Sequence, residues 1–246
     1  MLKLFQTKAL VLRSRPFGEK DRLLTLFSLE AGKVTARAPG ARHVKSKLSA
    51  GVEPLTSASF LLHRGRSIHT VSQLQVEQPY AKIRANIRDY ALGLYLGELV
   101  DKTMEEGAAS PPVYDLLADC WFLLNEQKGD RDLLTRFFEL TLLNILGYNP
   151  HFEDCIFCGS DKAPFFWNKS SGGIFCRDCS AGQSAIPLTG GSLALLRSFS
   201  TLETAKTVNL RGTGEQKTEL QVLLQQYLQY WTGIGPLQSL NFLQKI

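Results

Sequence analysis

Two Cys-x-x-Cys pairs constrain the fold of this chain more than any other feature of its sequence. The first pair is Cys155 and Cys158, and the second pair, Cys176 and Cys179, follows after 17 intervening residues. This spacing is typical of a tetrahedral site in which four cysteine sulfurs hold one Zn²⁺ ion. Because sulfur would fill all four corners, no position stays open for a substrate, and we expect the zinc to be structural.

Two disulfides, or four unrelated thiols, are the alternatives to a zinc site. Disulfides persist in oxidising compartments, whereas the N-terminal residues Met1–Lys8 have neither the continuous apolar stretch nor the cleavage site of a signal peptide. We therefore expect a cytoplasmic protein with reduced thiols, and no apolar stretch reaches the roughly 18 residues that would span a membrane. The fifth cysteine, Cys120, lies on an apolar stripe with helical spacing and is expected in a core.

The net charge of +5 is distributed unevenly along the 246 residues. Residues 1–80 contain 13 lysines and arginines against 5 acidic residues, a net charge of +8, whereas residues 81–246 contain 15 against 18, a net charge of −3. A basic N-terminal part joined to a mildly acidic remainder indicates that the first part meets a polyanion. A basic surface that is merely solvated is the alternative that charge alone leaves open.

The basic part has the sequence pattern of a small β-barrel. Short apolar runs alternate with turn signals such as Ala31-Gly32 and Arg64-Gly65-Arg66. Strands are predicted over Phe5–Arg13, Asp21–Leu29, Lys33–Ala38, Ser57–His63 and Ser67–Val76. Five strands in about 80 residues match the size of an OB-type barrel, although an SH3-like barrel would give much the same pattern.

Helical periodicity replaces this pattern after Pro79. The clearest helix runs from Val113 to Leu124 and follows the start signal Ser110-Pro111-Pro112. Further helices are predicted around residues 83–99, 133–145, 192–200 and 214–231. We therefore predict an α+β protein, in which a five-stranded OB-fold domain of residues 1–80 binds nucleic acid. An all-α domain of residues 81–246 follows, with a zinc motif inserted at about residues 151–186.

Cations gather on one side of the predicted barrel and on its loops. Lys33, Thr35 and Arg37 alternate with apolar residues, so the two cations should share a solvent face. The residues predicted to bind DNA are Arg13, Arg15, Lys33, Arg37, Arg42, Lys45, Lys47, Arg64 and Arg66. Such a groove follows a phosphate backbone, and its affinity falls with salt because binding releases counterions.

There is little sign that the barrel reads bases. Phe5, Phe17, Phe27 and Phe60 have rings that can stack on bases, but most of them must fill the core of so small a barrel. We therefore expect binding that tolerates any DNA sequence.

Three blocks of the sequence resemble RecO, a family of bacterial recombination mediators and DNA-repair proteins. The blocks are residues 18–27 followed by Gly32-Lys33 and residues 39–42, then Leu143–Pro150 running into the first cysteine pair, and finally Leu237–Leu243. Together they span nearly the whole chain in the family's order. The resemblance implies an N-terminal OB-fold, a helical domain with a zinc motif, binding of single- and double-stranded DNA, and annealing of complementary strands.

The resemblance also implies protein partners in the bacterial cytoplasm, at the nucleoid. These are RecR, single-stranded-DNA-binding protein (SSB) and, indirectly, RecA, whose loading onto SSB-coated DNA the family promotes. The acidic, apolar tail of SSB would bind a cation beside an apolar groove. Arg131 and Arg136, near Phe137 and Phe138, are candidates for that cation, and an ordinary surface charge is the alternative for each.

Two other classes of function stay open as alternatives. The chain has no G-x-x-x-x-G-K-[ST], H-E-x-x-H or G-x-S-x-G motif, so we expect no enzyme. A metal-dependent nuclease with dispersed carboxylates would reveal itself by Mg²⁺-dependent cleavage of DNA. A zinc-ribbon regulator would bind one DNA sequence selectively, but the zinc segment has few cations, Lys162, Lys169 and Arg177, among four acidic residues.

Overall fold

The computed structural model describes residues 4–243 and residue 245 of the chain. The chain divides into two compact units, one of residues 1–127 with residues 237–246, and one of residues 128–236. The last barrel strand ends at Gln78, two residues before the predicted domain boundary at residue 80. Whether residues 1–80 and 81–246 are separate domains stays a prediction. Among the described residues, no helix has the length and apolar character needed to cross a bilayer.

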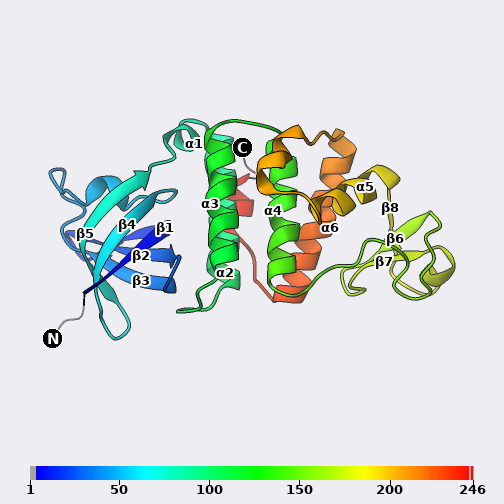
Figure 1. Cartoon of the computed structure of the whole chain (residues 1–246), viewed down its shortest axis with the longest axis horizontal. Helices are drawn as coiled ribbons and strands as arrows, with labels where there is room; N and C mark the ends of the chain where they lie inside the picture. Colours follow the sequence, from blue (N-terminus) through cyan, green and yellow to red (C-terminus); the bar gives the residue numbers. More distant parts are fainter. Residues whose placement is uncertain (1–3, 244, 246) are drawn as a thin grey trace. The chain divides into compact units, whose positions relative to one another are not determined.

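A five-stranded barrel begins the first unit (Figure 1). Its strands are β1 (Leu4–Phe17), β2 (Asp21–Ser28), β3 (Gly32–Ala38), β4 (Ser57–His63) and β5 (His69–Gln78). They pair in the order β1-β2-β3-β5-β4, and β1 closes the barrel on β4. All of these pairs are antiparallel except β3 with β5. This order is that of the OB-fold, the first of the two barrel types predicted from the sequence.

Period-two alternation builds the core of the barrel. On β3, Val34, Ala36 and Ala38 are buried and belong to the barrel's core cluster, whereas Lys33 and Arg37 lie on the outer face. Strand β1 extends four residues past its predicted end at Arg13, because residues 14–17 continue to pair with β2 beyond an irregularity in the register. The sequence signal stopped earlier because Ser14 and Arg15 are polar and Pro16 interrupts the strand pattern.

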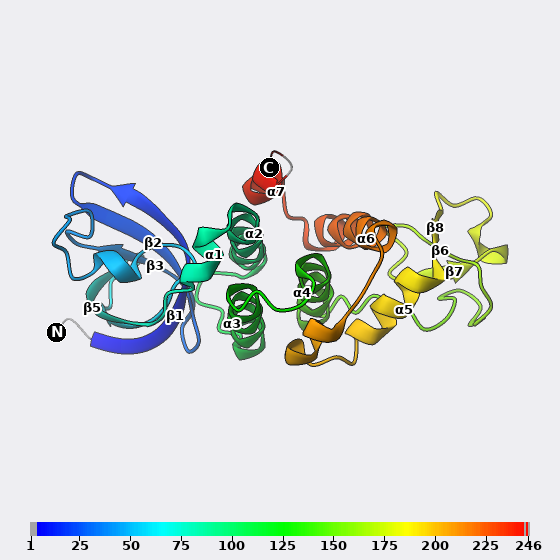
Figure 2. The ribbon, with the colours of Figure 1, turned by 90° about the horizontal axis from the view of Figure 1, so that it is seen from above.

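Helices α1 (Ala81–Ala85), α2 (Ile87–Thr103), α3 (Pro111–Asn125) and α7 (Gln238–Leu243) complete the first unit. The stretch predicted as one helix is divided at Asn86, whose side chain caps α2 by accepting from the backbone N–H of Asp89. Helix α7, which periodicity did not predict, lies beside α2 (Figure 2). The carboxylate of Glu98 on α2 accepts hydrogen bonds from the backbone N–H groups of Gln238 and Ser239, at 3.0 and 2.8 Å.

The second unit contains helices α4 (Arg131–Ile145), α5 (Gly190–Phe199) and α6 (Gly214–Thr232). It also contains a small sheet of strands β6 (Phe165–Trp167), β7 (Ile174–Cys176) and β8 (Ile186–Leu188), in the order β7-β6-β8. Short 3₁₀ turns span Ser49–Gly51 in the barrel, and Asp178–Ser180 and Thr204–Asn209 in the second unit.

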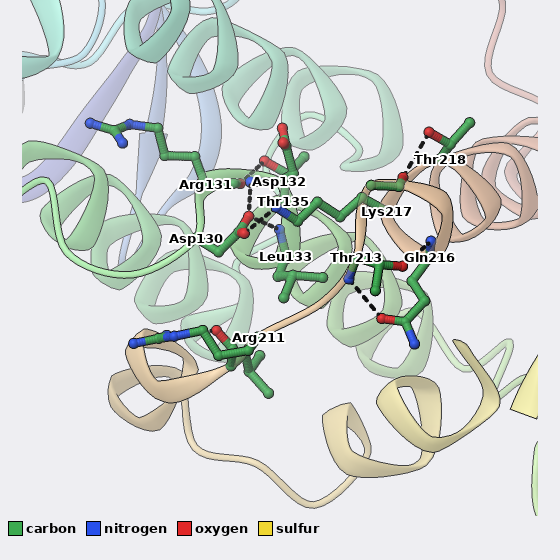
Figure 3. Close-up of polar contacts among 12 residues, drawn as sticks. Asp130, Arg131, Asp132, Leu133, Thr135, Arg211, Thr213, Gln216, Lys217 and Thr218 are labelled. Atoms are coloured by element: carbon green, nitrogen blue, oxygen red, sulfur yellow. Dashed lines mark hydrogen bonds and ion pairs between the residues drawn. The ribbon is translucent and has the colours of Figure 1, made fainter. Parts of the chain in front are cut away.

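The starts of α4 and α6 are tied together (Figure 3). Asp130 caps α4, because its carboxylate accepts from the backbone N–H groups of Asp132 and Leu133 at 3.0 and 3.1 Å, and it also forms an ion pair with Lys217 of α6. Helix α6 starts with a capping box between Thr213 and Gln216. The sequence predicted both helices and their approximate bounds, but it did not predict the ion pair that links their ends.

The segment that carries the four cysteines packs on α5 and α6. The ring of Trp167 lies 6.0 Å from that of Tyr227 on α6, whose hydroxyl donates to the carbonyl of Gly173 at 3.4 Å. From α5, Arg197 donates through Nε to the carbonyl of Phe152 at 2.8 Å. The segment therefore packs on helices of the second unit, whereas α1, α2, α3 and α7 belong to the first unit.

Candidate nucleic-acid interface and metal centre

The four cysteines of the two pairs meet in one cluster. All four Sγ atoms lie within 4.8 Å of one another, and those of Cys158 and Cys176 are 3.7 Å apart. A tetrahedron with zinc–sulfur bonds of about 2.3 Å has edges of about 3.8 Å, so this distance fits a zinc site. All four are free thiols, which excludes the disulfide alternative in this structure. Four sulfur donors match zinc better than the oxygen-seeking ions Mg²⁺ and Ca²⁺.

The pKa values of these thiols show that the four cysteines do not all ionise together without a cation. Burial opposes ionisation of Cys155, but backbone N–H groups, including those of Phe157 and Cys158, donate to its sulfur and lower its pKa to about 6. Hydrogen bonds with the thiols of Cys158 and Cys176 raise the pKa of Cys179 to about 12. Clustered thiols thus ionise one after another, whereas a divalent cation stabilises all four as thiolates.

Two glycines shape the backbone around the cluster. Gly159, directly after the first pair, has φ +69° and donates its N–H to the carbonyl of Cys155 at 2.8 Å. Gly173 has no room for a side chain, since a Cβ would lie 2.5 Å from the carbonyl oxygen of His151. The ring of His151 stays outside the cluster, with Nε2 2.8 Å from Oδ1 of Asp154. No zinc ligand besides the four cysteines is needed.

The outer face of the barrel strands is partly covered by the protein itself. The Nζ of Lys33 donates to the carbonyl of Asp101 at 2.5 Å and lies 3.7 Å from its carboxylate, and the Lys33 side chain is 18% exposed. Arg13 lies 3.3 Å from the same carboxylate, and Thr35 donates to Glu106 at 3.1 Å. Lys33 and Arg37 do share a face, but the expected solvent exposure of Lys33 is wrong. Acidic residues at the end of α2 and just beyond it pair with this part of β3, which no local pattern reveals.

The two loops at the other end of that face are joined by hydrogen bonds. Arg42, in the loop after β3, donates to the carbonyls of Gly18 and Glu19 in the β1–β2 turn, at 2.9 Å each. Asp21 accepts from the N–H of Gly40 at 2.8 Å and lies 3.2 Å from Nε of Arg37. Arg42 and Arg37 are therefore engaged in holding the turn and the loop together as one surface.

Five cations on the barrel are exposed and have no ion pair, side-chain hydrogen bond or ring contact within the described part of the chain. They are Arg15, Lys20, Lys45, Lys47 and Arg66. Lys20 was missing from the predicted set, because only the contacts of Arg42 bring its turn next to the loop that carries Lys45 and Lys47. Arg64, in the β4–β5 hairpin, instead lies over the ring of Phe5, 5.1 Å from its centroid.

The phenylalanines divide into core and surface as expected for a small barrel. Phe27 and Phe60 are fully buried, and Phe5 is half-buried between Arg64 and His69. Phe17 is 40% exposed and, with residues 18–21, lines a hollow of about 350 Å³ at the β1–β2 turn. Of the four rings, Phe17 is the most available to a ligand.

The two arginines expected near a partner site differ in exposure. Arg131, at the start of α4, is half-buried, and its side chain extends away from Asp130 (Figure 3). Arg136 is only 5% exposed and lies 3.0 Å from the carboxylate of Glu139. The expectation of a surface charge at Arg136 is therefore wrong.

Comparison with known proteins shows the family to which the chain belongs. The family "Recombination protein O N terminal" matches residues 1–80, and "Recombination protein O C terminal" matches residues 84–241. Similar proteins include DNA repair protein RecO of Pelotomaculum thermopropionicum, 34% identical over 93% of this chain and 90% of that protein. DNA repair protein RecO of Exiguobacterium sibiricum is 31% identical, over 93% of this chain and 92% of its own length. The chain therefore belongs to the RecO family of DNA repair and recombination proteins.

Proposed function

We propose that this protein binds single- and double-stranded DNA without sequence specificity and anneals complementary strands. With RecR, it would help to load RecA onto SSB-coated single-stranded DNA. Membership of the RecO family supports the role in recombination. The single observation that carries DNA binding is the set of five exposed, unpaired cations on the barrel, four of them in its loops and Arg15 near the end of β1.

The position of these cations matches the way OB-folds hold nucleic acid. The β1–β2 and β4–β5 loops of such barrels bind oligonucleotides together with the face of strands 2 and 3. Here Lys20 lies in the first of these loops and Arg66 in the second. Because Asp101 and Glu106 are paired with part of the strand face, we infer that DNA runs over the loops and past Arg37, not across the middle of β3.

Annealing on such a surface requires no covalent chemistry. Two single strands repel each other through their phosphates, and cations that hold both strands screen this repulsion and raise the local strand concentration. Base pairing then supplies the free energy. With Phe17 as the most exposed ring of the barrel phenylalanines, few base contacts are available, which favours binding that tolerates any sequence.

The zinc ion has a structural role in this proposal. Cys155, Cys158, Cys176 and Cys179 would hold it, and four sulfur ligands leave no open position for a reacting group. For the SSB tail, Arg131 is the remaining candidate contact of the two arginines, since Arg136 is buried. The resemblance to RecO supports RecR and RecA as partners, and a place in the bacterial cytoplasm at the nucleoid.

The test is fluorescence anisotropy of a labelled random-sequence single-stranded oligonucleotide, titrated with the full chain at several salt concentrations. We expect tight binding at low salt and a linear, steep fall of log affinity with log salt. The same protein should accelerate pairing of complementary oligonucleotides and leave non-complementary ones unpaired. Absence of binding at low salt would overturn the proposal. Cleavage of the DNA with Mg²⁺ would favour a nuclease, and strong preference for one sequence would favour a regulator.

A further inference from the structure

A polar hollow of about 1040 Å³ lies beside the four-cysteine segment in the second unit. Its walls are the turn between β6 and β7, the loop after the second cysteine pair, and the C-terminal half of α6. The side chains that matter for its chemistry are Asn168, Lys169, Gln183, Gln226, Gln229 and Tyr230. Neither the cysteine cluster nor the barrel explains why amides gather at this position.

The hollow is nearly free of charge. No carboxylate lines it, and Lys169 is its one cation among the described residues. Residues 220–243, which include the α6 wall, contain no charged side chain. A ligand that enters therefore meets hydrogen-bonding groups and no acidic residue that would repel a phosphate.

The four amides fall into a braced pair and a free pair. Asn168 donates through Nδ2 to Oε1 of Gln183 at 3.2 Å, and Gln183 donates through Nε2 to the carbonyl of Cys179 at 3.2 Å. The side chains of Gln226 and Gln229 have no hydrogen-bond partner in the described chain. The braced pair shapes the wall, and the free pair can bind a ligand.

Exposed aromatic rings continue outward from the hollow. Tyr230 is 49% exposed, and its ring lies 5.3 Å from that of Trp231. Trp231 in turn lies 6.2 Å from Tyr148, and both of these rings are also exposed. The Nζ of Lys169 lies over the ring of Tyr230, 6.0 Å from its centroid. Neighbouring exposed rings of this kind mark surfaces that bind a ligand or a partner.

We propose that this amide and aromatic surface binds bases of single-stranded DNA, as a second strand site on the same chain. Bases stack on exposed aromatic side chains regardless of sequence. Gln226 and Gln229 can hydrogen-bond to base edges, as amide side chains do with adenine, and Lys169 can meet a phosphate. This inference rests on the proposed function, because annealing requires that two strands be held at once.

One cation at this surface implies weak binding of a free strand. The site acts on a strand already near the protein, for which the effective concentration is high. It therefore contributes to annealing more than to the affinity of the first strand. That difference separates this site from the barrel loops in an experiment.

The test compares the double variant Tyr230→Ala, Gln226→Ala with the control Phe122→Ala. Phe122 is 45% exposed, lies on α3 in the first unit and is outside the hollow. Replacing one aromatic side chain that stacks on a base by alanine weakens a site about fivefold to a hundredfold. We expect the double variant to anneal complementary strands at least about fivefold more slowly than the wild-type protein, while its affinity for a short oligonucleotide stays within about twofold. The control should match the wild type in both assays.

Photocrosslinking identifies directly which residues contact the DNA strand. An oligonucleotide that carries 5-iododeoxyuridine is irradiated with the wild-type protein, and the modified peptides are identified by mass spectrometry. Cross-links at Tyr148, Tyr230 or Trp231 are expected. Zinc content and melting temperature of the variants must equal those of the wild type, which shows that the fold is kept. Normal annealing by the double variant, together with cross-links confined to the barrel, would overturn the second site and leave the proposed function standing. Failure of the wild-type protein to bind any strand would overturn both.

Discussion

Removal of Lys45 and Lys47 should weaken DNA binding far more than removal of two lysines that already have partners. The test pair is Lys45→Gln with Lys47→Gln, which removes two exposed, unpaired ammonium groups from the loop after β3. The matched control is Lys8→Gln with Lys82→Gln. Lys8 lies 3.7 Å from Glu77, and Lys82 lies 3.3 Å from Glu126, all within the first unit. Both variants lower the net charge of the chain by two.

The expected difference follows from counterion release. Each phosphate contact with a single strand contributes about 0.7 to the slope of log affinity against log salt. If all five unpaired cations contact phosphates, the wild-type slope is about −3.5, and loss of Lys45 and Lys47 reduces its magnitude by about 1.4. The control should reduce it much less, because a carboxylate already neutralises each of its ammonium groups and the pair would have to break before a phosphate could bind.

The assay is fluorescence anisotropy with a labelled random-sequence oligonucleotide, between about 50 and 200 mM salt. Thermal melting of both variants checks that the barrel is intact, and exposed ion pairs of this kind contribute at most about 1 kcal/mol to stability. Equal reductions of the slope in the two variants would mean that net charge alone controls binding. The assignment of the loop surface would then be wrong. An unchanged slope in both variants would refute the contact of Lys45 and Lys47 with phosphates.

Three further predictions concern the strand face, the metal centre and the second unit. Asp101→Asn should free Arg13 for phosphate and steepen the salt slope by about 0.7, while Lys33 keeps its hydrogen bond to the carbonyl of residue 101; an unchanged slope would show that this face is closed to DNA. Cys179→Ser should lower the amount of bound zinc, measured colorimetrically, and disorder the segment that carries the four cysteines. The affinity for an oligonucleotide should stay within about twofold, and a loss of affinity would mean that this segment, not the barrel, holds the DNA strand. Asp130→Ala should cost about 1 to 2 kcal/mol in urea unfolding at neutral pH because α4 loses its cap, whereas Asp130→Asn keeps the cap and costs less. Burial raises the pKa of Asp130, but the hydrogen bond from Lys217 and those from the backbone outweigh burial and lower this pKa below the usual 3.8. The stabilisation by the ionised Asp130 is therefore complete above pH 3.8 and is lost as the pH falls through the pKa of the folded state. Equal stability of Asp130→Ala and the wild-type protein at neutral pH would refute the role of the cap.

Local patterns predicted the secondary structure well where a single period dominates. The alternation on β3 and the 3.6-residue stripe of α3 both correspond to observed elements, and Cys120 is buried as its position on that stripe indicated. Polar residues at the end of β1 concealed part of that strand, because pairing with β2 holds them without an apolar signal. Helix α7 was hidden for a similar reason, since its first turn is stabilised by a carboxylate of α2, 140 residues away in the sequence.

The cysteine cluster could be predicted from the sequence because it depends on local spacing. Two ligands on each tight turn, and a spacer long enough to fold back, are properties of sequence spacing, and the four sulfurs need only two segments to meet. The hollow beside it was not readable, since its amides come from a hairpin turn, a loop and a helix that are far apart in the sequence.

The sequence by itself determined the kind of molecule: a basic five-stranded barrel, a helical remainder, a four-cysteine metal motif and a RecO-like order of sequence blocks. Tertiary structure alone decided which charges are available. Lys33, Arg37 and Arg42 look equivalent to Lys20 and Lys45 in the sequence, yet the first three are engaged by Asp101, Asp21 and backbone carbonyls. The physical reason is that residue type sets the charge of a side chain, whereas its freedom to bind a phosphate depends on carboxylates and carbonyls that distant segments bring within a few ångströms.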